Sequence, residues 1–452
     1  MLSLPRVAVG SIEGGGRAES AGCTEPISWA MMELLARQGC QVQHFHSHAT
    51  FPPYRAALSI TGLGSRHLDT WLMSKDVCRE LFVQGAAATD LALVEGCFEA
   101  SSACSGRDAS FDKLCDWLDL PRLVVVDAAR LAACSLPERP DQIDGVLLDR
   151  VASAADVFRL QTSLEALWNV PVLGALTELS SARAALAALP AGSVPPRELL
   201  RPLGDELARY CQSERLMALA RRRGFSRVRP ALFRAPPTSS EATEPLTVAV
   251  AFDKAFHCYF PDALDLLEML GAKVVDFSPL RDEVLPECDV VYLGCGHPER
   301  AADALTGNHC MLLAMRNHVR SGGRVYAEGG GMAYLCEHLV TPDGRKAPMV
   351  GVLPAVARFS PQSLPPAPVE VTLSKGTWLG HAGTRLRGYR NANWLIEPVG
   401  ALKSCLTEAG HEYDLVGRYQ VVASRIHLNF AAQREMLWSF FEPRLAELTL
   451  SF

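Results

Sequence analysis

The sequence lacks the marks of several large classes of protein. No apolar run approaches the roughly 18 residues that a membrane-spanning helix needs, and the 14 cysteines include no Cys-x-x-Cys pair, the usual spacing of a structural zinc site. The first ten residues lead into a short apolar strand, without the charged start and long apolar core of a signal peptide. We therefore expect no membrane span, and a cytoplasmic protein whose thiols are reduced.

The sequence also lacks a strong charge of either sign. Its 44 basic and 50 acidic residues leave a net charge of -6, and no basic stripe with interleaved aromatic residues is present. Proteins that bind nucleic acids usually carry such a basic surface, so we expect no nucleic-acid partner. The hydrophobic share of 48% and charged share of 21% are typical of a folded globular protein, and 452 residues suffice for two or three domains.

One segment separates two halves of similar organisation. Residues 234–245 are rich in proline, serine and threonine and have no apolar period, which is typical of a linker. In both halves, short runs of β-branched residues alternate with helical patterns, which predicts parallel sheets covered by helices. The prediction is two doubly wound α/β domains, at residues 1–233 and 246–452.

The expected elements can be placed along the chain. One helix should cover 27–37, another 263–270 with Gly271 at its end, and a final strand pair near 419–430 should precede a helix from Ala431. Further strands are expected at residues 7–9, 41–45, 90–95, 123–127, 145–149 and 171–173 in the first half, and at 246–253, 273–277, 289–293 and 324–327 in the second.

Residues 325–335 read Val-Tyr-Ala-Glu-Gly-Gly-Gly-Met-Ala-Tyr-Leu, which predicts a strand, a tight turn and the start of a helix. This is the shape of a nucleophile elbow. Gly329 stands at its apex, and a glycine has no side chain that could attack an amide carbon.

Several segments of the second half resemble, in order, the glutamine amidotransferase domain of cobyrinate (hydrogenobyrinate) a,c-diamide synthases, whose elbow reads Ala-Glu-Cys-Gly-Gly. The resemblance implies a class I glutamine amidotransferase-like domain in which a Cys–His pair hydrolyses glutamine. Gly329 then stands at the nucleophile position, His427 is kept, and Asn429 replaces the third member of the triad. The segments that carry the resemblance, besides the elbow, are residues 252–264, 277–283, 292–299, 349–354 and 421–430.

The first half resembles the P-loop NTPase-like (dethiobiotin synthetase-like) domain of the same family. The resemblance rests on residues 67–73, 93–96, 124–128, 145–151 and 171–176. It implies a Mg²⁺-binding carboxylate at Glu95 and further nucleotide-site positions at Asp127 and Asp149, with Asp149 in place of an adenine-reading Asn. Glu95 is equally compatible with a capped structural residue at a strand end.

The glycine-rich residues 10–26 stand where a P-loop should follow the first strand. One alignment places Arg17 at the Lys-Thr-Thr position of a P-loop and another places Thr24 there, but neither supplies the lysine. Both put a glutamate near the helix N-terminus, where it would repel a γ-phosphate. A glycine-rich connecting loop is favoured over an ordinary ATP site.

Three histidines, His44, His46 and His48, alternate along the second predicted strand and so point to one face. They could bind Zn²⁺, Ni²⁺ or haem iron. The alternative is a polar strand end without a metal, because side chains two residues apart on a strand are separated by about 7 Å, wide for three ligands of one ion.

Residues 388–394 stand where the family has a segment that helps to bind its tetrapyrrole substrate. Arg385, Arg387 and Arg390 could hold acidic groups there by bidentate contacts, or could form a basic surface strand. The other ligand-binding candidates lie in resembling segments and are Asp69, Trp71 and Tyr259.

Each half has lost a group that its reaction requires. We expect a pseudoenzyme of the cobyrinate a,c-diamide synthase family that binds an acidic tetrapyrrole or a partner protein and has no glutaminase activity. One alternative is an ATP-dependent tetrapyrrole amidoligase that uses free ammonia. Another is a structural subunit, as a homodimer or paired with a catalytic homologue. The cofactors to consider are a tetrapyrrole and a divalent metal.

Overall fold

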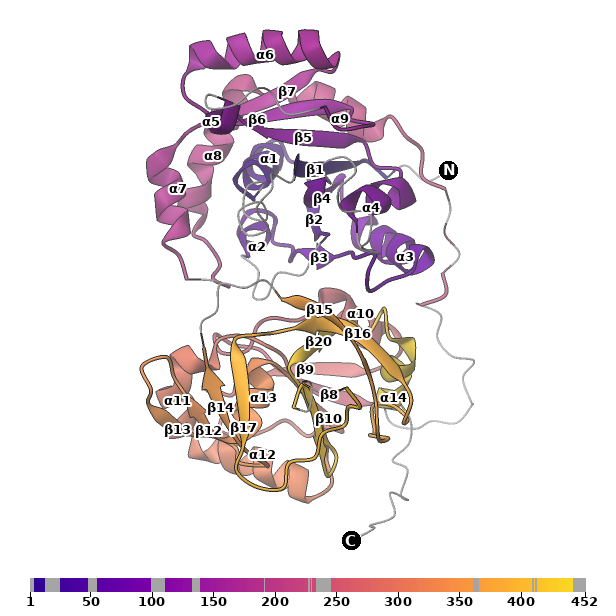
Figure 1. The fold of residues 1–452 in the computed structure, drawn as a ribbon, viewed down its shortest axis with the longest axis vertical. Coiled ribbons are helices and arrows are strands. Elements are labelled where there is room, and N and C mark those ends of the chain that lie inside the picture. The colour runs from indigo at the N-terminus through magenta and orange to yellow at the C-terminus, as the bar shows by residue number, and fades with distance from the viewer. Residues whose placement is uncertain are drawn as a thin grey trace. The chain divides into compact units, whose positions relative to one another are not determined.

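The computed structural model describes residues 4–12, 25–47, 55–98, 110–131, 139–190, 192–226, 228, 230–232, 245–360, 366–408, 410 and 413–441. The chain divides near residue 230 into two compact units (Figure 1). Most of the expected linker, residues 234–244, lies outside the described residues. Each unit is described by itself.

Unit 1 is built on a seven-stranded sheet in the order β3-β2-β4-β1-β5-β6-β7, and all its pairings are parallel. The strands are almost wholly buried, as expected when helices cover both faces. This confirms the parallel α/β prediction for the first half. The strands are β1 (Arg6–Ile12), β2 (Val42–His46), β3 (Arg66–His67), β4 (Leu91–Phe98), β5 (Arg122–Asp127), β6 (Gly145–Val151) and β7 (Val172–Thr177).

Helices cover both faces of this sheet, with α1, α2 and α8 on one side and α3 and α4 on the other (Figure 1). Helix α1 buries most of its length, since its apolar residues pack against the sheet and against α8. Ser74, Ser110 and Ser153 cap helices α3, α4 and α6 by accepting backbone N–H groups. The helices are α1 (Glu25–Arg37), α2 (Ala56–Thr61), α3 (Lys75–Ala86), α4 (Phe111–Leu118), α5 (Ala128–Leu131), α6 (Ala154–Trp168), α7 (Ser180–Ala187), α8 (Arg197–Tyr210) and α9 (Ser213–Arg221).

Unit 2 has a central six-stranded sheet in the order β18-β19-β11-β10-β8-β9. Its pairings are parallel except for the β18–β19 hairpin. The sheet confirms the second α/β prediction, and Gly271, with a φ of 97°, follows helix α10 as expected. The strands are β8 (Thr247–Ala251), β9 (Lys273–Phe277), β10 (Val290–Leu293), β11 (Arg324–Glu328), β18 (Leu415–Arg418) and β19 (Val421–Ser424).

The helices of unit 2 surround that sheet. The expected helix from Ala431 begins three residues later, because Asn429 Oδ1 accepts the Ala431 N–H at 2.9 Å and holds a turn there. The helices of unit 2 are α10 (Pro261–Met269), the 3₁₀ helix η1 (Pro298–Ala301), α11 (Ala302–Gly307), α12 (His309–Arg320), α13 (Gly330–Leu335) and α14 (Arg434–Phe441).

Two smaller sheets in unit 2 were not predicted. One has the order β13-β12-β14-β17 and the other β15-β16-β20. Among the described residues the last two strands diverge at Arg425, so that β19 joins the central sheet and β20 joins β16. The strands are β12 (Cys336–Val340), β13 (Lys346–Pro348), β14 (Leu353–Phe359), β15 (Ala367–Thr372), β16 (Arg385–Arg390), β17 (Trp394–Pro398) and β20 (Ile426–Leu428).

Candidate functional site

The elbow predicted in unit 2 is present. Strand β11 ends at Glu328, helix α13 begins at Gly330, and Gly329 turns the chain between them with φ 49° and ψ -108°. A side chain at this residue would begin 3.3 Å from His427 Nε2. The apex therefore faces an imidazole nitrogen, as a nucleophile in an elbow faces its base.

The glycines after the apex are required by close packing. A Cβ on Gly330 would lie 2.7 Å from Pro298 Cδ, and one on Gly331 would lie 2.3 Å from the carbonyl oxygen of Leu293. The first turn of α13 thus rests directly on residues 293–299, the loop that follows β10. Side chains at either position would push the helix away from this loop and open the elbow.

His427 is buried and held at both ring nitrogens. Its Nδ1 lies 3.4 Å from Glu328 Oε2, and the Nδ2 of Asn391 lies 3.5 Å from its Nε2. Glu328 is fixed in turn, since its Oε1 accepts the Leu428 N–H at 3.1 Å and the Tyr326 hydroxyl. With Asn391 donating to Nε2, the imidazole carries its proton on Nδ1, toward the carboxylate. Carboxylate, imidazole and apex follow one another as in a catalytic triad.

Asn429 does not take the third position of this arrangement. Its Oδ1 accepts the N–H groups of Ala431 and Ala432 at 2.9 and 3.4 Å, so its amide is committed to a turn. Glu328 contacts His427 instead. Sequence reasoning missed Glu328 because the two residues are separated by 99 positions; its place immediately before the apex was the available signal.

The loop that faces the elbow carries Cys295 and is braced by Tyr259. The hydroxyl of Tyr259 donates to the Ala251 carbonyl and accepts the Gly294 N–H at 2.9 Å. Burial raises the pKa of Tyr259 well above its usual value. Tyr259, expected as a ligand-binding residue, is thus engaged in holding the loop. Burial, followed by the contact with Cys258, also raises the pKa of the Cys295 thiol well above its usual value.

The arginines of β16 are largely paired within unit 2. Arg390 lies 3.0 Å from Asp414, and Arg387 Nε donates to Glu370 at 2.6 Å. Asp414 also pairs with Arg425 at 2.9 Å. Among the residues that the structure describes, only Arg385 of the three predicted arginines forms no ion pair, and it is exposed.

In unit 1, two of the predicted histidines meet a predicted carboxylate. His44, His46 and Glu95 are buried, and their ligand atoms lie within 4.8 Å of one another. His44 Nε2 is 3.0 Å from Glu95 Oε2. The rings of His44 and His46 lie closer than the strand spacing suggested, with centroids 4.6 Å apart, and the neighbouring strand β4 supplies the third group of the cluster. The grouping of all three histidines stays a prediction. His48, Arg17 and Thr24 lie outside the described residues.

Glu25, at the start of α1, belongs to the same region. Burial, and then the charge of Glu95, raises the pKa of Glu25 to about 8. The sequence placed a glutamate near this helix N-terminus, and the structure adds that its carboxyl group interacts with Glu95.

The other predicted nucleotide-site carboxylates form ion pairs within unit 1. Asp149, at the end of β6, is buried and paired with Arg183. Asp127, at the end of β5, accepts Arg150 Nε at 2.9 Å. Burial raises the pKa of Asp149, and the charge of Arg183 partly opposes this.

Asp69 and Trp71 form a turn before α3. Asp69 is buried, and its Oδ1 accepts the Trp71 N–H at 2.6 Å and the Leu72 N–H at 3.4 Å. This is a capping role.

Gly10 lies near the end of β1 and is closely packed. A Cβ on Gly10 would lie 2.6 Å from the Phe98 ring, so an aromatic side chain packs against this part of β1.

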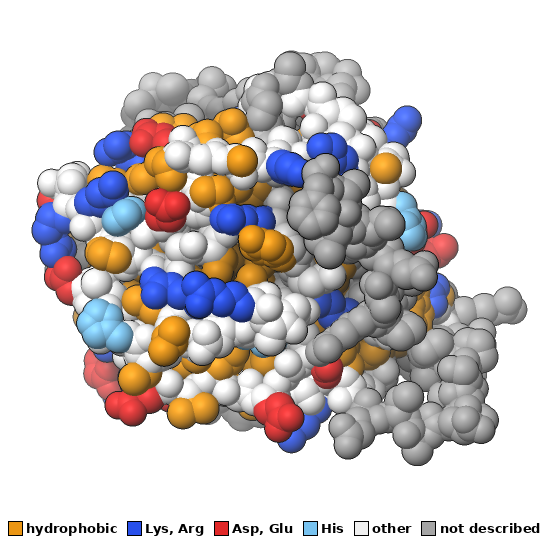
Figure 2. Space-filling view, turned by 90° about the horizontal axis from the view of Figure 1, so that it is seen from below, with side chains coloured by type: hydrophobic (Ala, Val, Ile, Leu, Met, Phe, Trp, Pro, Cys, Tyr) orange, Lys and Arg blue, Asp and Glu red, His pale blue; other side chains and the backbone are white. Residues whose placement is uncertain are grey.

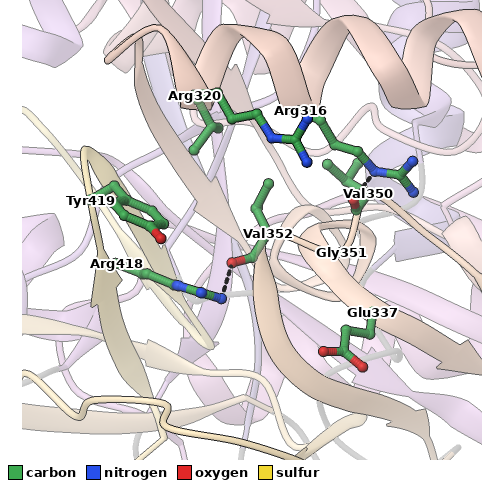
Figure 3. Close-up of a pocket in the computed structure, with 9 residues that line it drawn as sticks. Arg316, Arg320, Glu337, Val350, Gly351, Val352, Arg418 and Tyr419 are labelled. Atoms are coloured by element: carbon green, nitrogen blue, oxygen red, sulfur yellow. Dashed lines mark hydrogen bonds between the residues drawn. The ribbon is translucent and has the colours of Figure 1, made fainter.

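A pocket of about 580 Å³, which the sequence did not predict, lies in unit 2 and is lined by α12, residues 350–352 and the turn after β18. Arg316 and Arg320 extend into it from α12, and Arg418 from the end of β18 (Figure 3). Arg316 and Arg418 each donate to a backbone carbonyl, of Val350 and Val352. On the face seen in Figure 2, basic side chains form a short row among acidic and hydrophobic ones.

Comparison with known proteins shows which family the chain resembles. Residues 247–434 match the CobB/CobQ-like glutamine amidotransferase domain. A cobyrinate a,c-diamide synthase of Syntrophotalea carbinolica is 31% identical, over 86% of this chain and 85% of that protein. A hydrogenobyrinate a,c-diamide synthase of Streptomyces coelicolor is 30% identical over 97% of both chains. A cobyrinate a,c-diamide synthase of Listeria monocytogenes is 28% identical, over 92% of this chain and 95% of that protein. No helix in the described part of the chain is long and apolar enough to span a bilayer.

Proposed function

Because the chain belongs to the family of cobyrinate and hydrogenobyrinate a,c-diamide synthases, we propose that it is a member that no longer hydrolyses glutamine. This proposal rests on the absence of a side chain at Gly329, the apex of the elbow. His427 and Glu328 are arranged to activate a nucleophile whose side chain would begin 3.3 Å from His427 Nε2, and residue 329 has no side chain. A Cys–His site without its thiol cannot form the thioester on which glutamine hydrolysis depends.

The carboxylates of unit 1 support loss of the nucleotide-dependent step as well. Asp149 is buried and ion-paired to Arg183, so it could read a base only after that pair was broken. The sequence between β1 and α1 supplies no lysine for the β- and γ-phosphates. The competing proposal is an amidoligase that uses free ammonia with an altered nucleotide site.

We propose an acidic tetrapyrrole as the retained ligand. The relatives are named for cobyrinate and hydrogenobyrinate, which carry many carboxylates. Since Arg387 and Arg390 are ion-paired, the pocket lined by Arg316, Arg320 and Arg418 offers a second place for acidic groups. Its volume of about 580 Å³ lies in the usual range for small-molecule sites and would accept part of such a ligand.

The test is a titration of the full chain with cobyrinate or hydrogenobyrinate, followed by visible absorbance, with ATP, Mg²⁺ and ammonia added afterwards. We expect saturable binding and no amide product by mass spectrometry. Arg320→Gln should weaken binding if the arginine pocket holds the ligand, whereas Arg345→Gln, an exposed arginine paired with Asp303, should not.

Two results would overturn parts of this proposal. Formation of an amide would establish the amidoligase. Absence of tetrapyrrole binding, together with a stable complex with an intact homologue in size-exclusion chromatography, would establish a structural subunit.

A further inference from the structure

The buried cluster in unit 1 lies where two parallel strands run side by side. His46 on β2 is the register partner of Glu95 on β4, and His44 is the partner of Leu93. His44 and His46 are two residues apart, so both project to one face of the sheet. Their rings lie edge to face with centroids 4.6 Å apart, and both rings are within reach of the same carboxylate.

The spacing of the three ligand atoms is close to that of a metal site. Ligand atoms about 2.0–2.1 Å from a tetrahedral ion are about 3.3 Å from one another. His44 Nε2 and Glu95 Oε2 are 3.0 Å apart, and all three groups fall within 4.8 Å. Small side-chain rotations, with the strands left in place, would bring them around one ion.

The surroundings of His44 orient it for this role. Its Nδ1 is hydrogen-bonded to Ser65 Oγ at 2.9 Å, which leaves Nε2 directed at Glu95. Histidine ligands of metals commonly have such a second hydrogen bond at the other ring nitrogen, which fixes the ring and its tautomer.

The charge of the region favours a cation. Glu95 is almost completely buried, with 1% of its side chain exposed, and its Oε2 lies 3.0 Å from His44 Nε2. Removing a carboxylate from water is costly unless positive charge accompanies it. A divalent ion between the imidazoles and Glu95 would supply that charge.

We propose that His44, His46 and Glu95 bind one divalent transition-metal ion of the Zn²⁺ class. Two imidazoles and one carboxylate suit Zn²⁺, Co²⁺, Ni²⁺ or Fe²⁺, whereas Mg²⁺ prefers oxygen ligands throughout. Three protein ligands leave at least one coordination position for water or a small donor ligand.

The test is metal binding by tag-free, full-length protein. Calorimetric titration with Zn²⁺ should give about one site per chain, and millimolar Mg²⁺ should not displace the ion. Co²⁺ should give the intense visible bands of four- or five-coordinate nitrogen ligation, and added Zn²⁺ should abolish them. The Co²⁺ spectrum of the unmodified chain tests the site without any variant.

Variants then identify the ligands. His46→Gln and Glu95→Gln should each weaken Zn²⁺ binding at least about tenfold, since even second-shell changes cost that much. His309→Gln, which changes an exposed histidine in unit 2, should leave affinity unchanged and so controls for surface imidazoles. Absence of a stoichiometric site, displacement by Mg²⁺, or equal affinity in folded His46→Gln and Glu95→Gln proteins would overturn the proposal.

Discussion

The Cβ atom of Cys295 lies 3.1 Å from the point at which a side chain on Gly329 would begin. The same point is 3.2 Å from His427 Cε1. The elbow of the resembling family has a cysteine at the apex, whereas this chain has Gly329 there and carries Cys295 on the facing loop. The side chain of Cys295 therefore begins beside Gly329 but does not occupy the apex of the elbow.

The first prediction concerns the reactivity of that thiol. Burial raises the pKa of Cys295 well above its usual value, so it remains protonated at neutral pH, and only the thiolate is a good nucleophile. In iodoacetamide labelling followed by peptide mass mapping at pH 7–9, Cys295 should react far more slowly than the exposed Cys310. Faster labelling of Cys295 than of Cys310 would reveal an activated thiol and contradict this view of the loop.

The second prediction moves the thiol from the facing loop to the apex of the elbow. Gly329→Cys alone should destabilise the protein, because a side chain with φ 49° is strained, by about 1–3 kcal/mol, and would crowd Cys295. Adding Cys295→Gly removes the crowding. We expect denaturant unfolding to show a higher stability for the double variant than for Gly329→Cys, and glutamate release from the double variant alone. Equal stability of the two proteins would show that the loop and apex do not compete for space.

The third prediction tests Glu328 as the residue that positions His427. Glu328→Gln places an amide donor opposite the Nδ1–H of His427, and the unfolding free energy should fall by about 1–3 kcal/mol. Urea denaturation measures the effect. Glu337→Gln, an exposed change on β12, should alter stability by less than about 0.5 kcal/mol. If the Glu328→Gln protein is as stable as the parent, Glu328 does not hold His427 in position.

The fourth prediction concerns the Asp149–Arg183 pair. Arg183→Met should cost about 3–5 kcal/mol of stability, because it leaves a buried carboxylate without its partner. Without Arg183 the pKa of Asp149 in the folded protein rises further. A carboxyl group whose pKa is higher in the folded than in the unfolded state makes the folded protein less stable as pH increases. The deficit in thermal or urea unfolding should therefore shrink as pH is lowered.

A matched exposed pair serves as the control for Arg183. Arg159→Met, which removes the partner of Asp156, should cost less than about 1 kcal/mol. If the Arg183 and Arg159 variants lose the same small amount, Asp149 is not dependent on its arginine and remains open to other ligands.

Much of this architecture was predictable from local pattern. The buried strands and the elbow at residues 325–335 follow from short apolar runs and glycine placement, which act over a few residues. The contacts that define the candidate sites do not follow from local sequence pattern. Glu328 reaches His427 between two different sheets, and His46 meets Glu95 through the register of β2 with β4. Both contacts join segments that are distant in the sequence. The smaller sheets of unit 2 were missed because strands such as β15 and β16 are only partly buried. The edge strand β15 has little burial, and β16 carries three arginines, which weakens the apolar signal.

Asn429 is a residue for which the sequence predicted a role that the structure does not show. Its position after His427 suggested a triad member, but an Asn side chain also competes well for nearby backbone N–H groups. It forms a turn in the structure. Residue type and spacing did not distinguish these two uses.

Glutamate release from glutamine by the unmodified protein, compared with a Cys295→Ser variant, decides whether the elbow at Gly329 is inactive. We predict that both proteins release glutamate at the rate of buffer alone, because Gly329 supplies no nucleophile and Cys295 is a buried, protonated thiol. Turnover by the unmodified protein that disappears in Cys295→Ser would contradict it, and would show that the thiol beside the apex has taken over the reaction.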